Sequence, residues 1–253
     1  MPDPRNWHQF TSTQLAAFIF NNYKFNHETI VDVYTTIVKN TAYNANDSRS
    51  GREAVENLKE LMKYRFLDRL FGKSEEGKMS VAAVYHRLSS VKRIRQNDQF
   101  YLQYAMAAID GGKLDDAETF LNTALSIAKS KGTEYSPHQI LDQRARLYLR
   151  KNSQHNHHIS KKELSTAQRD LMSALSDSKH PMIYPLRSGP LILKLVDEKI
   201  EEMGEELRKG YLDLVILMRE RESRVTDNRH FRRGEQKQLV KDIKLAQLCL
   251  ENY

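Results

Sequence analysis

Gly72, Lys73 and Ser74 are residue types that end a phosphate-binding loop, and this stretch is the first candidate for chemistry. In such a loop the backbone N–H groups surround the phosphates and the lysine neutralises them. The complete motif also needs a glycine five positions before the Gly-Lys pair, where this chain has Leu67. The residues before Gly72 follow a helical pattern rather than a strand pattern. We therefore predict that Gly72 ends a helix and that the chain has no phosphate-binding loop here.

Three histidines and one cysteine are the candidate metal ligands. His155, His157 and His158 lie close together in a polar stretch, but a zinc site needs three or four rigidly held ligands. No cysteine or carboxylate accompanies them at a suitable spacing, so we predict solvated loop histidines. Cys249 is the single cysteine and is expected to be a buried helical residue. One cysteine excludes an intramolecular disulfide, and we expect a reducing, cytoplasmic location.

Adjacent carboxylates are frequent and could in principle support hydrolysis. They occur at 75–76, 115–116, 201–202 and 205–206. Catalytic carboxylates require contrasting environments that separate their pKa values, whereas these pairs fall on polar faces or at helix ends. A small all-α hydrolase is therefore the weakest alternative. We predict no catalytic residue, no metal site and no cofactor in this chain.

Basic side chains are the candidate partner-binding residues. They form three groups: Lys92, Arg93 and Arg95; Arg144, Arg146 and Arg150; and Arg229, Phe231, Arg232 and Arg233. In the second group, Arg146 and Arg150 are four residues apart and share one helix face. In the third, an aromatic ring lies among cations, which suits phosphate and stacking contacts and equally suits docking against another domain. Solvated arginines are the simpler alternative to binding.

The totals of the sequence indicate a soluble, globular chain. Its 253 residues are 40% hydrophobic and 29% charged, and that length can bury a substantial core. The start, MPDPRNWHQF, lacks the long apolar core of a signal peptide, and no stretch has the roughly 18 apolar residues that cross a bilayer. The formal net charge of +7 is compatible with an acidic partner or nucleic acid and identifies neither.

Helical periodicity runs through almost the whole chain, and no strand is predicted. Only 10 glycines and 6 prolines interrupt it. The expected helices include one starting after Asn26 or His27, one long helix at 54–71, one from 81 to about 96, two at 191–207 and 212–224, and a last one from about 235 to 250. Lys209 and Gly210 are expected to be a break or a weak point. The polar segment from Gly72 to Lys78 is the best candidate for a domain boundary.

The stretch from Asn97 to Gly132 has the pattern of a helical hairpin. Tyr101, Tyr104, Ala105 and Ala108 lie on one stripe, and the pair Gly111-Gly112 permits the left-handed turn that ends a helix.

The helix after this turn carries small residues at a regular spacing. The pattern Ala-x3-Leu-x2-Ala occurs at Ala117, Leu121 and Ala124 and again at Ala167, Leu171 and Ala174. Each set lies on one helical face, where alanines let a neighbouring helix approach closely and the leucine fills the gap between the axes. A helix–turn–helix unit of about 34 residues resembles a tetratricopeptide repeat. The unit departs from that family at Lys129, where a proline is usual.

A narrower resemblance covers Val84 to Asn152 and includes the phrases FYLQYA and HQILDQRARLYL. This region is similar to the C-terminal helical part of bacterial antiphage defence proteins of the STAND NTPase type and their relatives. In those proteins an N-terminal effector and often a central NTPase precede a repeat region that recognises a phage component or transmits that recognition. The resemblance implies that this chain is the sensor part and that Trp7 to Phe71 is a helical connector.

The sequence thus predicts an all-α protein with a helical N-terminal subdomain at 1–77. A right-handed solenoid of tetratricopeptide-like hairpins is predicted at 78–253. The expected function is non-catalytic: a protein-interaction or sensor module whose partners are a protein ligand, in the resemblance a phage protein, and neighbouring effector or NTPase domains. A helical scaffold that binds nucleic acid through its basic surface is the alternative. Homo-oligomerisation is left open, and no membrane partner is expected.

Overall fold

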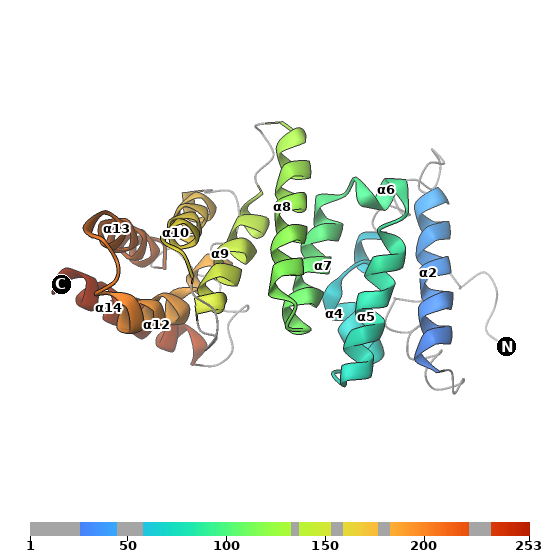
Figure 1. Ribbon diagram of the computed structural model, residues 1–253, viewed down its shortest axis with the longest axis horizontal. Helices are drawn as coiled ribbons and strands as arrows, with labels where there is room; N and C mark the ends of the chain where they lie inside the picture. Colours follow the sequence, from blue (N-terminus) through green and yellow to red (C-terminus); the bar gives the residue numbers. More distant parts are fainter. Residues whose placement is uncertain (1–25, 45–57, 133–136, 153–158, 177–182, 223–233) are drawn as a thin grey trace. The chain divides into compact units, whose positions relative to one another are not determined.

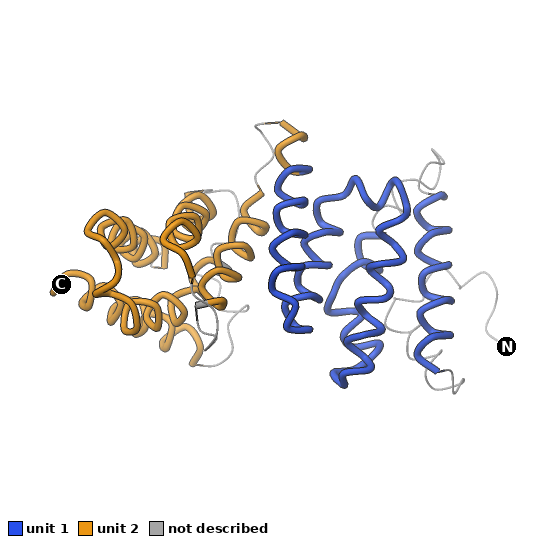
Figure 2. Tube along the Cα trace, viewed as in Figure 1, with its two compact units in different colours: residues 1–127 blue, residues 128–253 orange. Residues whose placement is uncertain are grey.

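The structure, a computed structural model, describes residues 26–44, 58–132, 137–152, 159–176, 183–222 and 234–253. All regular secondary structure in these residues is helical, as the periodicity predicted (Figure 1). The chain divides into two compact units, residues 1–127 and 128–253 (Figure 2). None of the described helices combines the length and the apolar character that crossing a membrane requires.

The first unit is organised around α5. Its helices are α2 (His27–Asn44), α4 (Tyr64–Phe71), α5 (Glu75–Leu88), α6 (Lys92–Arg95), α7 (Asp98–Asp110) and α8 (Leu114–Ser130), and the last of these ends just beyond the division between the units. Helix α5 packs against α2, α4 and α7 (Figure 1). Helix α2 begins where predicted, because Asn26 Oδ1 accepts a hydrogen bond of 2.8 Å from the N–H of Thr29 and caps the first turn.

The long helix predicted at 54–71 is not continuous in its described part. A helical turn covers 58–61, Lys63 is extended with φ −67° and ψ 127°, and α4 begins at Tyr64. The apolar spacing continues across this break, so periodicity alone gives no sign of it.

Two tyrosine hydroxyls satisfy the main-chain carbonyls that this break releases. Tyr34 donates to the carbonyl of Leu61, and Tyr85 donates to the carbonyl of Met62 at 2.8 Å. Both tyrosines are buried, and burial raises the pKa of each hydroxyl, so both remain protonated donors. The break is therefore stabilised by side chains from α2 and α5 rather than by its own residues.

Gly72 ends α4, as predicted, with a φ of 76° that favours glycine. Ser74 caps α5, and its Oγ accepts a hydrogen bond of 3.0 Å from the N–H of Gly77. Gly77 has no room for a side chain, because a Cβ there would lie 2.5 Å from the carbonyl oxygens of Phe71 and Gly72. The predicted domain boundary at 77/78 falls at this close junction of α4 with α5, whereas the two compact units divide at 127/128.

The helix predicted from 81 to about 96 is interrupted as well. Helix α5 ends at Leu88, and the hydroxyls of Ser89 and Ser90 donate to the carbonyls of His86 and Arg87 at 2.6 and 2.8 Å. Serine side chains that bond to nearby carbonyls compete with continuation of the helix. The chain then forms the separate short helix α6.

Helices α7 and α8 form the predicted hairpin. Gly112 has a φ of 72°, and the N–H of Lys113 donates to the carbonyl of Ala108 at 2.8 Å, which closes the helix end in a left-handed turn. The ring of Tyr104 stacks on that of Phe120, with centroids 3.8 Å apart, and joins the two helices. The small and apolar residues predicted for the seam are buried: Ala105, Ala108, Ala117, Leu121 and Ala124.

The second unit contains the remaining helices. They are α9 (His138–Asn152), α10 (Lys161–Ser176), α11 (Ile183–Leu186), α12 (Gly189–Lys199), α13 (Glu205–Glu222) and α14 (Glu235–Glu251). Helix α10 packs against α9 and α13, and α14 packs against α12 and α13 (Figure 1).

A break or weak point was expected at Lys209–Gly210, but the break between these two helices lies earlier in the chain. Helix α12 ends at Lys199, a turn covers 200–204, and α13 runs without interruption through Gly210. Gly210 serves packing instead: a Cβ there would lie 3.3 Å from Gln168 Cδ of α10, and Gln168 Nε2 donates to the carbonyl of Gly210 at 3.1 Å.

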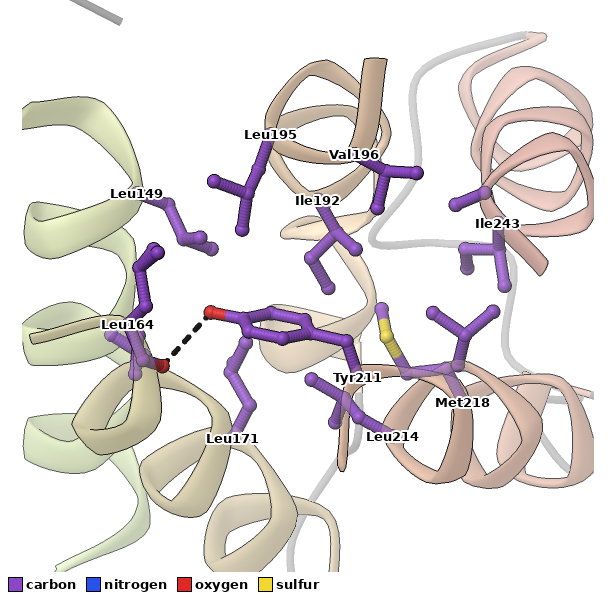
Figure 3. Close-up of a cluster of buried hydrophobic side chains, with 14 of the residues drawn as sticks. Leu149, Leu164, Leu171, Ile192, Leu195, Val196, Tyr211, Leu214, Met218 and Ile243 are labelled. Atoms are coloured by element: carbon purple, nitrogen blue, oxygen red, sulfur yellow. Dashed lines mark hydrogen bonds between the residues drawn. The ribbon is translucent and has the colours of Figure 1, made fainter. Parts of the chain in front are cut away.

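The core of the second unit is mainly aliphatic. Leu171 from α10, Leu195 from α12 and Leu214 from α13 are fully buried in it (Figure 3). Tyr211 is buried among them, and its hydroxyl donates to the carbonyl of Leu164 at 3.0 Å (Figure 3). The predicted seam of α10 is confirmed, since Ala167, Leu171 and Ala174 are all buried.

Candidate partner-binding surfaces

The first predicted group of cations lies on α6. Lys92 and Arg95 are exposed, whereas Arg93 is partly buried and donates to the carbonyl of Ala42 in α2 at 3.5 Å. Arg93 therefore helps to hold α6 against α2, and Lys92 and Arg95 offer their charge to solvent.

In the second group, Arg144 is used inside the protein. Its Nε and Nη2 donate to the two carboxylate oxygens of Asp170 in α10, at 2.7 and 2.9 Å. Both side chains are largely buried, with 16% and 8% of their surface exposed. In a bidentate ion pair of this kind, two N–H groups of the guanidinium each bond one oxygen of the carboxylate. Arg144 thus connects α9 to α10.

Arg146 and Arg150, from the same group, lie beside a second buried carboxylate. Asp142 is 1% exposed, and Arg146 Nη1 lies 4.0 Å from its Oδ2, which is too long for a direct hydrogen bond. Burial raises the pKa of Asp142 to about 6, although the nearby guanidinium groups of Arg146, Arg150 and Arg187 act in the opposite direction. Arg146 and Arg150, which share a helix face, are themselves partly buried.

The third predicted group, Arg229, Phe231, Arg232 and Arg233, lies outside the described residues, as do His155, His157 and His158. Within the part of the chain that the structure describes, no group of three or more His, Cys, Asp or Glu side chains could hold a metal ion.

The adjacent carboxylates lie mostly at helix ends, as predicted. Three pairs occupy the first turns of α5, α8 and α13, where a negative charge suits the positive end of the helix dipole. Cys249 differs from the prediction: it is partly exposed rather than buried, with its Sγ 4.0 Å from Asp197 Oδ1.

A groove between α13 and α14 was not anticipated from the sequence. Its volume is about 450 Å³, and Ile216 of α13 with Val240 and Ile243 of α14 form its apolar part. Ile216 is 37% exposed, Val240 is partly exposed and Ile243 is buried. Arg219 Nη1 donates to Gln247 Oε1 at 2.5 Å and connects the two helices along the groove.

The charged residues that line the groove are Arg219, Glu220 and Glu222 of α13 and Lys244 of α14, and two further exposed lysines share a helix face with Lys244. Lys237, Lys241 and Lys244 are spaced four and three residues apart and therefore share one helix face. Leu248 continues the same face and is 44% exposed, and Leu245 beside it is 40% exposed. The lysine spacing can be read from the sequence, but the position of Lys244 in a groove depends on how α13 packs against α14.

No family model matches the chain, and no curated protein or solved structure matches it.

Proposed function

We propose that this chain is a non-catalytic interaction module built from tetratricopeptide-like helical hairpins. The observation that carries the proposal is the burial of the same small–large–small pattern in α8 and α10, at Ala117, Leu121 and Ala124 and at Ala167, Leu171 and Ala174. In repeat proteins of this kind, hairpins stack through such seams into a right-handed solenoid, and its concave surface binds protein ligands.

Within this class, we propose a role as the sensor of a bacterial antiphage defence protein. The support is the resemblance over Val84 to Asn152, which includes α7, α8 and α9 and hence both sides of the predicted hairpin seam. The partners would be a phage protein and the effector or NTPase domains that precede such sensors. An effector or NTPase encoded in the same frame would support the proposal.

The direct test is affinity capture with the full 253-residue chain from phage-infected and uninfected bacteria. We expect enrichment of one phage protein from the infected cells, and co-expression of that protein with the chain should reproduce the complex. The absence of any phage protein across several unrelated phages would contradict the sensor role.

Binding of nucleic acid is a second candidate function, favoured by the exposed cations Lys92 and Arg95 and the net charge of +7. Phosphate contacts are strongest at low salt, so fluorescence anisotropy with labelled single-stranded and duplex oligonucleotides at about 50 mM salt is the decisive condition. Binding there that weakens steeply as salt is raised would favour this function over protein recognition. No binding there would eliminate it.

A further inference from the structure

We propose that Arg187 is a pH-dependent connection in the second unit: it pairs with Glu235 while Asp142 is protonated and transfers to Asp142 once that carboxyl has ionised. Arg187 lies between α11 and α12, Glu235 is the first residue of α14, and Asp142 belongs to α9. The transfer loosens the first turn of α14 when the pH is raised. This device goes beyond the proposed function and does not depend on it, because it concerns the packing of the unit and not its ligand.

Asp142 is a buried carboxylate that lacks the hydrogen bonds an ionised carboxylate needs. It is 1% exposed, and within the part of the chain that the structure describes its Oδ1 has no hydrogen-bond partner. Its Oδ2 accepts one long bond, of 3.3 Å, from the side-chain amide of Gln143. Asp170, by comparison, accepts two bonds of 2.7 and 2.9 Å from Arg144. Because an under-bonded buried charge is costly, Asp142 either keeps its proton or recruits a donor.

The cations that act on Asp142 come from two elements. Arg146 and Arg150 belong to α9 itself, whereas Arg187 acts from the turn between α11 and α12. Arg146 Nη1 lies 4.0 Å from Oδ2, one helical turn away on α9, so it can approach this oxygen without changing how the helices pack. Arg187 is therefore the donor whose movement affects a second helix.

The other helices that pack against α9 hold their charges in different places. On α10, Asp170 is paired with Arg144. On α12, Lys194 lies 3.6 Å from Glu198 Oε1, and Asp197 is exposed. Helix α11 has no Asp, Glu, Lys, Arg or His. The charge that acts on the buried carboxyl of α9 therefore comes from the arginines.

The pair between Arg187 and Glu235 is loose enough to exchange. Arg187 Nε lies 3.0 Å from Oε1 without forming a hydrogen bond to it, and Nη2 donates to Oε2 at 3.4 Å, longer than the roughly 2.7–2.9 Å of a strong ionic pair. The Glu235 side chain is 27% exposed, so water can solvate it when the guanidinium leaves. Asp142 is closed off from water, and once ionised it gains more from Arg187 than Glu235 does.

The first turn of α14 is the part that responds. Gly234 at its N-cap supplies no side-chain hydrogen bond, so the turn relies on contacts such as the one with Arg187. The middle of α14 is held by close packing, since a Cβ added to Gly189 would lie 2.7 Å from Ile243 Cγ1. Loss of the ion pair therefore releases the first turn while the middle of the helix stays docked.

The titration of Asp142 sets the pH of the exchange. Burial raises the pKa of its carboxyl to about 6, so the exchange falls between about pH 5 and pH 7. Below this range Asp142 is protonated and Arg187 stays with Glu235, and above it the ionised carboxylate takes the guanidinium. The geometry thus supplies the two partners, and the pKa supplies the pH at which Arg187 changes between them.

A double-mutant cycle on Arg187 and Glu235 tests the exchange. Arg187→Met, Glu235→Gln and the double variant of the full chain are unfolded in urea at pH 5 and pH 7, and the non-additive part of their effects is the coupling. We expect the pair to raise the folding equilibrium constant about threefold at pH 5 and not measurably at pH 7. The control cycle, Lys199→Met with Glu202→Gln, concerns a pair 2.9 Å apart and should give the same coupling at both pH values.

The variant Asp142→Asn identifies the trigger. Its side chain cannot ionise, so the coupling between Arg187 and Glu235 should stay at about threefold at pH 7. Equal coupling at pH 5 and pH 7 in the otherwise wild-type chain overturns the proposal. A coupling that is lost at pH 7 in the Asp142→Asn background as well also overturns it, because another group would then be the trigger.

A second measurement needs no change in the core. In wild-type protein labelled with ¹⁵N at arginine, the Nε resonance of Arg187 should shift with a midpoint near pH 6, and Arg187→Lys assigns it. The same resonance should stay constant between pH 5 and pH 7 in Asp142→Asn. An unchanged Arg187 resonance in the wild type overturns the proposal even if Asp142→Asn does not fold.

Discussion

The two units place polar groups in their cores in different ways. In the first unit, the hydroxyls of Tyr34 and Tyr85 donate to main-chain carbonyls, and among its described residues one carboxylate, Asp98 in the first turn of α7, is buried. In the second, Tyr211 does the same, but Asp142 and Asp170 are buried beside arginines as well. Neutral donors cost little to bury, whereas a buried carboxylate must be compensated by a partner. The second unit is therefore expected to be more sensitive to mutation of polar residues and to pH.

The largest expected effect is removal of the carboxylate that pairs with Arg144. Asp170→Ala removes the carboxylate that pairs with a largely buried guanidinium and should lower the free energy of unfolding by about 3–5 kcal/mol. Chemical denaturation of the variant and the wild type measures this change in the free energy of unfolding. Replacing both partners, Arg144→Met with Asp170→Leu, should restore most of the loss, because no buried charge then remains. Arg169→Ala, at a neighbouring exposed position, is the control. If Asp170→Ala lowers the free energy of unfolding no more than Arg169→Ala does, the second unit is not especially sensitive to mutation of its buried polar residues.

Asp142 should make the second unit respond to pH. Its folded-state pKa of about 6 is above the ordinary value of 3.8, so the folded state binds the proton more tightly than the unfolded state does. The protonated carboxyl of Asp142 stabilises the folded state fully below about pH 4. This stabilisation, about 3 kcal/mol, is lost as the pH rises through about 6. Asp142→Asn should therefore be more stable than the wild type at pH 7, with a difference that shrinks toward pH 4.

Denaturation of wild type and Asp142→Asn at several pH values between about 4 and 7 measures this difference. Asp213→Asn, at an exposed position of α13, is the control and should follow the wild type. A stability difference for Asp142→Asn that does not change with pH would show that the carboxylate is not buried as described.

Close helix contacts offer a third comparison between the units. At Gly77 an added Cβ meets two backbone carbonyls at 2.5 Å, while at Gly189 it meets Ile243 Cγ1 at 2.7 Å. Backbone cannot move aside as a side chain can, so Gly77→Ala should cost about 1–3 kcal/mol and Gly189→Ala less. Gly111→Ala, whose Cβ would meet its surroundings at ordinary distances, should be near neutral in the same urea titrations. If Gly77→Ala and Gly111→Ala lower the free energy of unfolding equally, the junction of α4 with α5 is not as tight as described.

The smallest expected effects are those of single hydroxyls. Tyr85→Phe and Tyr211→Phe each remove one donor to a buried carbonyl and should each cost about 1 kcal/mol. Tyr43→Phe, at a residue 69% exposed, should cost nothing measurable. Because these donors are neutral, the cost should be the same at pH 5 and pH 7, and a pH-dependent cost for Tyr85→Phe would show that its hydrogen bond is coupled to a titrating group.

Local signals in the sequence predicted much of the fold. The start of α2 at Asn26, the helix end at Gly72, the turn at Gly111-Gly112 and the span of α14 all follow from caps, glycines and apolar spacing, which act over one or two helical turns. The breaks at Lys63 and at 200–204 were not predicted, because the apolar spacing gives no sign of them. The carbonyls at the first break are satisfied by Tyr34 and Tyr85, which are 27 and 23 residues away.

The candidate surfaces likewise depend on residues that are distant in the sequence. Arg144, Arg146 and Arg150 could be singled out as cations on one helix, but Asp170, which pairs with Arg144, is 26 residues away. The spacing of Lys237, Lys241 and Lys244 can be read from the sequence, but only the packing of α13 against α14 shows that Lys244 lines a groove.

Composition, periodicity and short caps were enough to predict a helical chain, its buried seams at Ala117–Ala124 and Ala167–Ala174, and the helix end at Gly72. These properties depend on backbone preferences and on spacing along one helix. Tertiary packing decided which arginines are used inside the protein, where the long helices break and where α13 and α14 form a groove. Burial and pairing are properties of neighbours in space, and a carboxylate such as Asp142 acquires its raised pKa only when other helices exclude water from it.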